Sequence, residues 1–415
     1  MVRTMKISRN RVSLNVICFA ALLVIFSASA GQCSAVRKIN QIKEPLFSCP
    51  AIVLSGSGFD LKLETDSLPV KSIFLVDIKN NSNAFPLELK NPSDSKGIRS
   101  YKAIVSSDVP EGLYNLAAEF DNGVTDNQPH SVRVIKKYKK QYHFIHLTDI
   151  HFNAGKVMPE KRNAIRQQLL RDIEESKPEF VLFSGDLGLY PKDYDRDYED
   201  SYRRFKQELS VPIFMVPGNH EFYIDKTETS DIDGKSYWDV SYGPAYNSFD
   251  YDGMHYMGLN TFDWPARWRD RYNEEVKRAG TTGLAYIGPE QWEWMKSDMA
   301  KAAGSDKTIV IYTHIPVELL QGGRRIGTVN QEKMPGPTYN KVLKIFEKAG
   351  VSHVFVGHVH INSVRKLGNT TEMLTLGAGH TNRDSDPRWG YRIIRVFNNK
   401  ITGTETHEIT YTDLD

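Results

Sequence analysis

The chain has 415 residues, of which 40% are hydrophobic and 25% are charged. Residues 1–30 hold four of the 53 basic residues and none of the 51 acidic ones, so the remainder carries 49 basic against 51 acidic side chains. This balance excludes a general basic field for nucleic acid, and three cysteines are too few for thiol chemistry to be the basis of function.

The first 35 residues are predicted to be a targeting signal. A basic start precedes an apolar core from Val16 to Phe26, and Ala28-Ser29-Ala30 forms an A-x-A cleavage site, with Ala35 as a second option. The basic residues of the start are Arg3, Lys6, Arg9 and Arg11. We therefore expect residues 1–30 to be a cleaved signal peptide and the mature chain to be extracytoplasmic, either periplasmic or secreted.

Two alternatives to simple cleavage stay open. Val12 to Ala30 is nearly long enough for an uncleaved membrane anchor, although Ser13 is polar. Cys33 could carry a lipid, although Gln32 stands where lipoprotein signals have a small residue. Contact with a membrane is expected only through this segment. Cleavage after Ala30 leaves Cys33 and Cys49, which permits one disulfide and does not require it.

Residues 36–140 are predicted to form a small all-β sandwich of Ig-like type, followed by a linker. From Ser48 to Ile135, strand-like alternation is interrupted by turn residues and shows no helical period. The clearest strands are Leu61-Lys62-Leu63 and Ser131-Val132-Arg133-Val134, and the turns are Asn80-Asn81-Ser82, Pro110-Glu111-Gly112 and Asp121-Asn122-Gly123. Because the segment holds no cluster of ligands or nucleophiles, we expect an accessory or docking module, with carbohydrate or surface binding as an alternative. The basic run Lys136 to Lys140 is interpreted as a solvated linker.

Residues 141–415 are predicted to form an α/β catalytic domain. Short apolar runs, separated by helix-period segments, indicate buried strands of βαβ units. These runs are Phe144 to Thr148, Phe180 to Phe183, Pro212 to Val216, Ile309 to Tyr312 and Val354 to Val356. Helices are expected over Lys161 to Ser176, from Gly288-Pro289-Glu290 onward, and over Tyr339 to Ala349. The runs Met373 to Leu376 and Tyr391 to Phe397 are expected to add strands to a second sheet.

A short polar motif follows each of the five apolar runs. In chain order the motifs are Asp149-Ile150-His151, Gly185-Asp186, Gly218-Asn219-His220-Glu221, Thr313-His314 and Gly357-His358-Val359-His360. Because ligands gather beyond the carboxyl ends of strands in such folds, we expect all five motifs at one edge of the sheet. They offer two carboxylates, one amide oxygen and five imidazoles, which is enough to hold two divalent metals.

This string resembles the motifs of the calcineurin-like metallophosphoesterases, D-x-H, G-D, G-N-H-(D/E), H and G-H-x-H, over residues 142 to 405. The resemblance implies a four-layer α/β/β/α sandwich that hydrolyses phosphate esters. It also implies one metal bound by Asp149, His151, Asp186 and His360, and a second bound by Asp186, Asn219, His314 and His358.

The chemistry of the residues supports this division. Two cations about 3.5 to 4 Å apart need an anion between them, and Asp186 beside flexible Gly185 suits a bridging role. The metal pair would polarise the phosphoryl group and lower the pKa of a shared water, the expected nucleophile. His220 is expected to donate a proton to the departing alkoxide, with Glu221 or another carboxylate orienting its other nitrogen. Nitrogen and oxygen ligands without thiolate suit Mn, Fe, Zn or Co.

Two motif positions indicate which branch of this family the chain resembles. Purple acid phosphatases have D-x-G in the first motif and a tyrosine three residues after the G-D aspartate. Here His151 fills the first motif, Leu189 stands three residues after Asp186, and Tyr190 comes one place late. We therefore expect no tyrosinate ligand and a site closer to the D-x-H branch, which includes the class III cyclic nucleotide phosphodiesterases; a cyclic nucleotide substrate is a hypothesis only.

Other histidines and aromatic residues have less specific interpretations. His143, His146 and His353 are expected to be core residues or to support ligands, whereas His255 and His380 could line the cleft. Trp292 and Trp294 are expected to pack a helix on a sheet, while Tyr237 to Phe249, Thr261 to Tyr272 and Gln321 to Pro337 are predicted to be loops near the site. Candidate substrate contacts in these loops are Trp264, Arg267, Trp268 and Arg324.

These observations predict an exported, dinuclear metal-dependent phosphoesterase acting on a small-molecule ester, with phosphodiesters favoured. One alternative is an extracytoplasmic phosphomonoesterase of acid-phosphatase type. The other is an inactive binding or scaffold protein on the same fold. The natural substrate, the metals and the oligomeric state stay open at this level.

Overall fold

The computed structural model describes residues 37–64, 69–154, 159–227, 230–326, 332–379 and 388–410. All elements named below belong to one compact unit, residues 35–415. The predicted targeting signal and His380 lie outside the described residues. Within these ranges, no helix is both long enough and apolar enough to cross a membrane.

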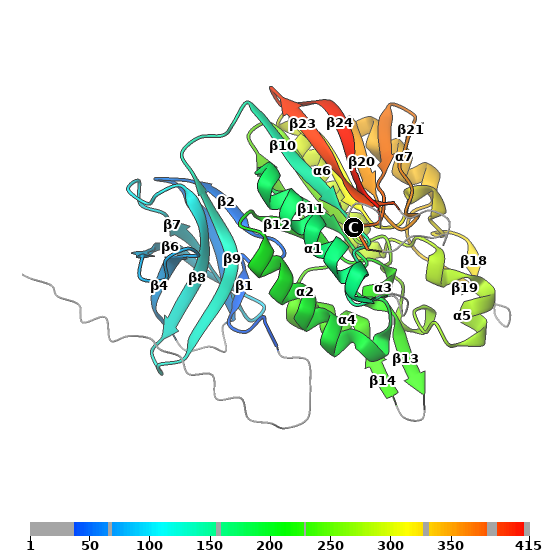
Figure 1. The fold of residues 1–415 in the computed structure, drawn as a ribbon, viewed down its shortest axis with the longest axis horizontal. Coiled ribbons are helices and arrows are strands. Elements are labelled where there is room, and N and C mark those ends of the chain that lie inside the picture. The colour runs from blue at the N-terminus through cyan, green and yellow to red at the C-terminus, as the bar shows by residue number, and fades with distance from the viewer. Residues whose placement is uncertain are drawn as a thin grey trace, which may run out of the picture. The chain divides into compact units, whose positions relative to one another are not determined.

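The N-terminal part of this unit consists of two β-sheets (Figure 1). One sheet has the order β1-β3-β7-β6 and the other the order β2-β9-β8-β4-β5. Their strands are β1 (Ile42–Glu44), β2 (Ala51–Leu54), β3 (Gly58–Glu64), β4 (Val70–Asp77), β5 (Ala84–Pro86), β6 (Glu88–Ser95), β7 (Ile98–Ile104), β8 (Gly112–Phe120) and β9 (Thr125–Ile135). Leu61, Leu75 and Leu116 are fully buried in a core that both sheets share. The all-β character is confirmed, and the Ig-like assignment stays a prediction.

The first sheet of the α/β part has the order β12-β11-β10-β23-β24. Its strands are β10 (Gln141–Leu147), β11 (Val181–Ser184), β12 (Ile213–Val216), β23 (Trp389–Phe397) and β24 (Lys400–Ile409). The strands β10, β11 and β12 are parallel, so their carboxyl ends share one edge, whereas β23 pairs with β10 in the antiparallel sense. Helix α1 (Pro159–Ser176) connects β10 to β11, and α2 (Tyr194–Glu208) connects β11 to β12. Ile165, Leu169 and Ile173 of α1 are buried, as their spacing predicts.

The second sheet has the order β15-β16-β17-β20-β22-β21. Its strands are β15 (Asn247–Tyr251), β16 (Met254–Leu259), β17 (Thr308–Thr313), β20 (Val351–Val356), β21 (Ser363–Leu367) and β22 (Thr370–Leu374). Helix α6 (Pro289–Gly304) precedes β17, and α7 (Tyr339–Ala349) precedes β20. Both helices begin where the sequence predicts, α6 with Pro289 in its first turn and α7 with Thr338 as its cap.

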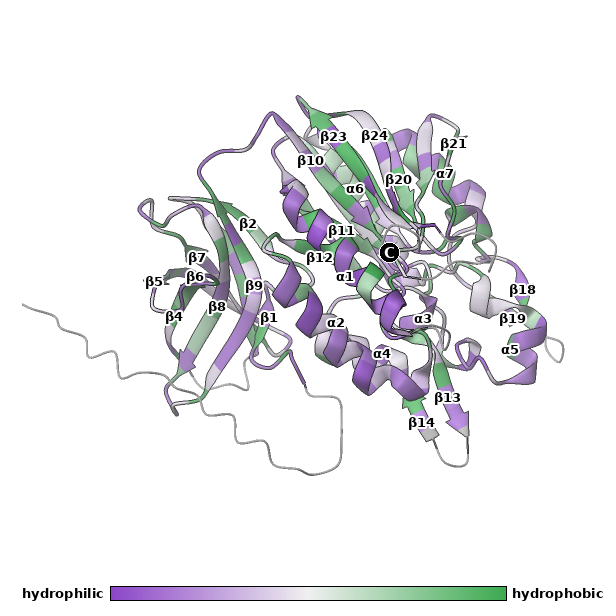
Figure 2. Cartoon of the chain, in the orientation of Figure 1, coloured by the Kyte–Doolittle hydropathy of each residue, from purple (hydrophilic) through white to green (hydrophobic). Residues whose placement is uncertain are grey.

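The two sheets pack face to face with helices outside them. Phe144 and Leu182 of the first sheet share a buried core with Tyr256, Val310 and Phe355 of the second. The opposite faces of both sheets join a larger core together with α1, α6 and α7. In Figure 2 the outward sides of α1 and α2 are largely hydrophilic, while hydrophobic residues run along β23. The predicted four-layer α/β/β/α architecture is confirmed.

Of the two strands expected to join the second sheet near the C-terminus, one does and the other does not. Met373 and Leu374 do lie in β22 of the second sheet, but Tyr391 to Phe397 lie in β23 and pair with β10 of the first. The predicted loop Tyr237 to Phe249 is also wrong, because it overlaps the end of α4 (Gly234–Ser241) and the start of β15. Two short helices, α3 (Asn219–Phe222) and α5 (Glu274–Ala279), complete the described α-helices. Two hairpins pair β13 (Ile224–Thr227) with β14 (Ser230–Asp233) and β18 (Arg325–Ile326) with β19 (Glu332–Lys333). Short 3-10 helices in the described chain lie at Pro191–Asp193, Ala266–Trp268, Thr281–Gly283 and Val317–Leu319.

The segment between β1 and β2 packs into the α/β core. Phe47 is 2% exposed and its ring lies 5.0 Å from the ring of Tyr202 on α2. The carbonyl of Ser48 accepts the backbone N–H of Met215 on β12 at 2.8 Å, and the Ser48 hydroxyl donates to the carbonyl of Tyr242. Residues assigned by sequence to the accessory domain therefore complete the edge of the first sheet.

Candidate metal centre

The seven predicted ligands come from the ends of five strands in two sheets. Asp149 follows β10, Asp186 follows β11, and Asn219 opens α3 directly after β12. His314 follows β17, and the loop after β20 carries the last two ligands, His358 and His360. The expectation of one shared edge of a single sheet is wrong. The motifs meet because the carboxyl ends of strands in two stacked sheets face the same region.

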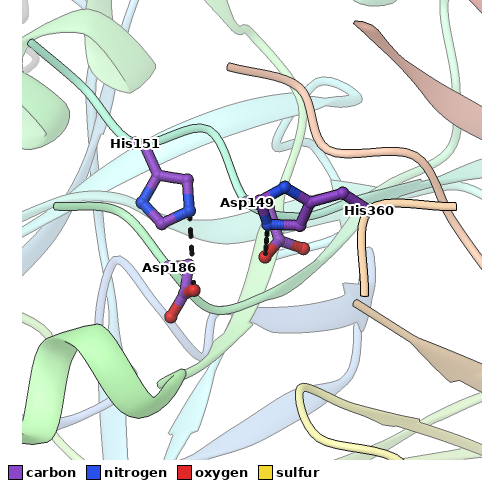
Figure 3. Close-up of side chains that lie close together, drawn as sticks. All are labelled: Asp149, His151, Asp186 and His360. Atoms are coloured by element: carbon purple, nitrogen blue, oxygen red, sulfur yellow. Dashed lines mark hydrogen bonds and ion pairs between the residues drawn. The ribbon is translucent and has the colours of Figure 1, made fainter. Parts of the chain in front are cut away.

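Four side chains make the first group, shown in Figure 3. Asp149, His151, Asp186 and His360 each offer one ligand atom, and these atoms all lie within 4.8 Å of one another. His360 Nε2 is 2.8 Å from Asp149 Oδ1, and His151 Nε2 is 3.5 Å from Asp186 Oδ2. His151 is 1% exposed, and Asp149 is fully buried. This spacing and these donor types could hold a divalent metal ion.

A second group shares Asp186 with the first. Asp186, His314 and His358 bring their ligand atoms within 4.8 Å of one another. His314 Nε2 is 3.2 Å from Asp186 Oδ1, so the two carboxylate oxygens of Asp186 face different histidines. Asn219 Oδ1 completes this group, 2.9 Å from His314 Nε2 and 3.2 Å from His358 Nδ1.

The amide of Asn219 is oriented by its own hydrogen bonds. Its nitrogen donates to the hydroxyl of Tyr223 and to the carbonyl of Thr282, the latter at 3.1 Å. Because the nitrogen is held on that side, the oxygen faces His314 and His358. Tyr223 was missed by sequence reasoning, and its only signal is its place four residues after Asn219, one helical turn away.

Backbone carbonyls orient two imidazoles of the predicted ligands. The Nδ1 of His151 is 2.7 Å from the carbonyl of Gly188, and the Nδ1 of His314 is 2.8 Å from the carbonyl of Ser184. A carbonyl only accepts, so each Nδ1 carries a proton, and each Nε2 is left as the nitrogen that can bind a metal once it carries no proton itself. Both Nε2 atoms face Asp186, which is the arrangement that metal-binding histidines adopt.

Five of the seven predicted ligands have left-handed backbone conformations. Their φ angles are 53° at Asp149, 42° at His151, 61° at Asp186, 67° at His358 and 54° at His360. Such angles cost free energy for residues with a side chain and persist only where the surroundings impose them. Their concentration at the strand ends indicates that the fold holds the chain in strained turns in order to bring these side chains together.

The motif glycines permit close approach of the strand ends. A Cβ at Gly218 would lie 2.1 Å from Asp186 Oδ1, and one at Gly357 would lie 2.0 Å from Thr148 Oγ1 and 2.6 Å from Asp149 Oδ2. Gly185 has a φ of 84°, and a Cβ there would lie 2.2 Å from the backbone nitrogen of Gly218. The glycines of the G-D, G-N-H and G-H-x-H motifs therefore shape the walls around the two aspartates.

Asp149 and Asp186 are held as carboxylates in the metal-free protein. Burial opposes the ionisation of Asp186, but His314 and His220 outweigh it and hold the pKa well below its usual value. Burial also opposes ionisation of Asp149, and His360 and His314 hold its pKa low. In return, burial lowers the pKa of His314 but Asp186 and Asp149 raise it, to about 9. A group of anions that stabilises extra protons in this way is a cation site.

Glu221 is fully buried and binds the backbone around Asp186. Its carboxylate accepts the N–H groups of Asp186 at 2.7 Å, Leu187 at 2.6 Å, Gly188 at 3.2 Å and Gly218 at 2.7 Å. Burial raises its pKa, and the four N–H donors act in the opposite direction. Glu221 therefore fixes two ligand-bearing turns to each other.

His220 lies at the edge of this group. Its Nε2 is 3.9 Å from Asp186 Oδ2, and its side chain is 18% exposed. Its Nδ1 is 2.6 Å from the carbonyl of Leu189. The expectation that Glu221 or another carboxylate orients this ring is wrong, because the carboxylate of Glu221 is occupied by the backbone and a carbonyl fills the role.

The other histidines of the described chain lie in varied surroundings. His146 is fully buried and contacts the hydroxyls of Thr375 and Ser184, so it supports the turn whose Ser184 carbonyl orients His314. His255 does not line the cleft. Its ring lies 2.8 Å from Asp250 on β15 and 3.1 Å from Asp298 on α6, away from the predicted ligands. Burial lowers the pKa of both His143 and His353.

The predicted aromatic substrate contacts are mostly structural. Trp264 and Trp268 are 3% and 4% exposed and belong to the main core, where Trp264 stacks on Tyr286 with ring centres 4.7 Å apart. Arg267 lies 5.7 Å from the Trp268 ring. Arg324 is exposed and donates to Gln321. Trp292 and Trp294 pack against the core from α6, as predicted.

Comparisons with known proteins find a matching family and similar solved structures. The model of the calcineurin-like phosphoesterase family matches residues 142–362. Purple acid phosphatase PPD1 from yellow lupin (Lupinus luteus) seeds is similar with a TM-score of 0.50 and 10% identity, over 86% of this chain and 71% of that one. A dimetal phosphatase from Danio rerio is similar with a TM-score of 0.45 and 15% identity, over 65% of this chain and 99% of that one. No curated protein matches the sequence.

The family match covers more than half of the chain and includes all seven predicted ligands. The chain therefore belongs to the calcineurin-like phosphoesterase family and is a metal-dependent phosphoester hydrolase.

Proposed function

We propose that the protein is an exported, dinuclear metal-dependent phosphoesterase that prefers phosphodiesters to monoesters. The observation that carries the proposal is the position of Asp186, whose Oδ2 faces His151 Nε2 at 3.5 Å and whose Oδ1 faces His314 Nε2 at 3.2 Å. A carboxylate placed between two groups of potential ligands is suited to bridge two cations.

The donor set fits two divalent transition metals. Asp149, His151, Asp186 and His360 would hold one, and the other would be held by Asp186, Asn219, His314 and His358. Nitrogen and oxygen ligands without thiolate suit Mn, Fe, Zn or Co. When bound, such a pair polarises the phosphoryl group and lowers the pKa of a coordinated water.

His220 is proposed to protonate the leaving oxygen. The Leu189 carbonyl holds its Nδ1–H, so proton transfer takes place at Nε2, on the side of the ring that faces Asp186. This nitrogen is close to the metal ligands without belonging to either four-residue set. It is therefore placed to contact the ester oxygen of a phosphate bound at the metals.

Export and diester preference rest on sequence. The basic start, the apolar core and the A-x-A site of residues 1–30 support export by a cleaved signal. His151 in the first motif resembles the D-x-H branch, and this resemblance supports a phosphodiester substrate, including the hypothesis of a cyclic nucleotide. N-terminal sequencing of the exported protein tests the first point, with a mature start after Ala30 expected and an intact Met1 contradicting it.

Hydrolysis assays test the proposed activity. The purified mature chain, reconstituted with Mn²⁺, should hydrolyse bis(p-nitrophenyl) phosphate with a higher kcat/KM than p-nitrophenyl phosphate, and cyclic AMP tests the narrower hypothesis. Preference for the monoester would replace the proposal by an extracytoplasmic phosphatase. Failure to hydrolyse any ester with Mn, Fe, Zn or Co would favour a binding or scaffold role.

A further inference from the structure

An arginine that was not among the candidate substrate contacts lies beside His220. Arg271 Nη1 donates to the carbonyl oxygen of Leu189 at 3.4 Å, and the same oxygen is 2.6 Å from His220 Nδ1. The Arg271 guanidinium is 4.8 Å from the centre of the Tyr223 ring, which is 4.9 Å from the His220 ring. Arg271 is therefore a close neighbour of the residue proposed to protonate the leaving group.

The charge of Arg271 is not neutralised by the part of the chain that the structure describes. Arg269, two residues earlier, has a carboxylate of Asp233 at 2.7 Å, but no described carboxylate lies within ion-pairing distance of Arg271. The neighbouring Asp270 carboxylate accepts the N–H of Tyr272 at 3.0 Å instead. A partly exposed guanidinium without a carboxylate partner keeps its donors available for an incoming anion.

Two exposed tyrosines flank this guanidinium. The Tyr190 ring is 5.1 Å from Arg271 and the Tyr272 ring is 5.7 Å from it, and these tyrosines are 38% and 43% exposed. The Lys192 ammonium lies 5.8 Å from the centre of the same Tyr190 ring. We call Tyr190, Lys192, Arg271 and Tyr272 the cationic rim. Its rings limit the freedom of the guanidinium and offer flat surfaces to a ligand.

The geometry of His220 shows which part of a substrate the cationic rim can reach. The Nε2 of His220 is turned towards Asp186, whereas its Nδ1 is turned towards the Leu189 carbonyl that Arg271 shares. Arg271 thus meets the Leu189 carbonyl on the Nδ1 side of His220. A phosphate bound at the metals would place its leaving group next to His220, so an anion at Arg271 belongs to the leaving group.

We propose that the cationic rim is a leaving-group site, and that the enzyme favours phosphate esters whose leaving group carries a second anionic group, a carboxylate or another phosphate. This specificity rests on the proposed function, because it concerns the leaving group that His220 is proposed to protonate. Arg271 is the residue that selects the anion, and Tyr190 and Tyr272 contact the body of the leaving group.

Matched esters test the site. The metal-loaded enzyme is assayed with 4-carboxyphenyl phosphate, with 4-phosphonophenyl phosphate and with the neutral 4-carbamoylphenyl phosphate, and with the methyl diesters of all three. We expect Arg271→Gln to lower the kcat/KM ratio of anionic to neutral ester by about tenfold, since one charge-assisted hydrogen bond is lost. Arg271→Lys should keep most of the ratio, and Arg271→Glu should lower it further.

The control variant is Arg278→Gln, an exposed arginine on α5 whose Nε donates to the carbonyl of Glu274. It should leave the ratio unchanged. The two anionic esters distinguish a carboxylate from a phosphate as the preferred group. The same ratio in the wild type and in Arg271→Gln, with the neutral ester still hydrolysed, overturns the leaving-group site alone. Absence of hydrolysis of every ester by the wild type overturns the proposed function and the site together.

Discussion

The carboxylate of Glu221 accepts the backbone N–H of Asp186 at 2.7 Å. Asp186 has a φ of 61°, so this bond and the neighbouring ones to Leu187, Gly188 and Gly218 hold a strained turn in place. The consequence is that a residue with no expected contact to metal controls the position of the carboxylate that faces both ligand groups.

Glu221→Gln should weaken metal binding by about 10- to 100-fold, because an amide cannot accept all four N–H groups and the Asp186 turn relaxes. Titration of the metal-free protein with Zn²⁺ measures the change. Glu372→Gln is the matched control, since Glu372 is also fully buried but pairs with Arg365 on the second sheet. Both variants should lose stability, and unchanged zinc affinity in Glu221→Gln would contradict the positioning role.

His220→Ala should slow hydrolysis of esters with alkyl leaving groups by about 10²- to 10⁴-fold and that of nitrophenyl esters far less, because nitrophenolate needs no proton to depart. Comparing kcat for methyl nitrophenyl phosphate with kcat for a dialkyl phosphate separates the two cases. His143→Ala, on β10 away from the ligands, serves as the control. Equal losses on both kinds of ester would remove the proton-donor role.

Metal affinity should rise with pH up to about 9. Burial lowers the pKa of His314, but Asp186 and Asp149 outweigh burial and raise this pKa to about 9 in the metal-free protein. Below this pH the ring therefore carries a second proton and a positive charge. Ligation needs the neutral ring, and metal binding must therefore displace this proton. Calorimetric titrations between pH 6 and 9 should show proton release and about a tenfold gain in affinity per pH unit for each proton displaced. A zinc affinity independent of pH over this range would show that His314 is neutral before metal binds.

His255 should stabilise the protein below neutral pH. It lies between Asp250 and Asp298; burial opposes its charged form, but both carboxylates outweigh burial and raise its pKa from 6.5 to about 9. A raised folded-state pKa contributes stability that is complete below pH 6.5 and is lost as the pH rises through about 9. The free energy of unfolding of His255→Gln should thus fall below that of the wild type by on the order of 3 kcal/mol at pH 6 and approach it near pH 10. Urea denaturation at both pH values measures this, and an equal deficit at both would show that the lost contribution is packing.

The convergence of the predicted ligands could be expected because each lies in a polar motif near the end of a buried apolar run, as Asp186 follows β11 and His314 follows β17. Sheet membership was not predictable in the same way. The alternating residues of Tyr391 to Phe397 indicate a strand, but the hydrogen-bond partner of a strand depends on the rest of the fold, and β23 pairs with β10. The amphipathic helix α2 was also missed, because its buried face is made of tyrosines rather than aliphatic residues.

The supporting contacts of the site could not be obtained from residue types. Glu221 acts through the backbone N–H groups of Asp186, Leu187 and Gly188, which lie 33 to 35 residues away in the chain. Trp264 and Trp268 resemble substrate contacts in sequence because they lie in a loop with Arg267, yet both side chains are buried in the core. Arg271 has no sequence signal that separates it from the other arginines of the same loop. Arg271 is distinguished by the lack of a carboxylate partner among the described residues and by the carbonyl it shares with His220.

The proposed dinuclear centre depends above all on Asp186 serving two metals, and metal analysis of the Asp186→Asn variant tests this most directly. Asp306→Asn is the control, because Asp306 is exposed and has a φ of 53°, close to the 61° of Asp186, so both backbones accept asparagine. Inductively coupled plasma mass spectrometry after reconstitution should find two metals per chain in the wild type and in Asp306→Asn, and fewer than two in Asp186→Asn. Two metals bound with unchanged affinity in Asp186→Asn would contradict the bridging role and with it the dinuclear centre as described.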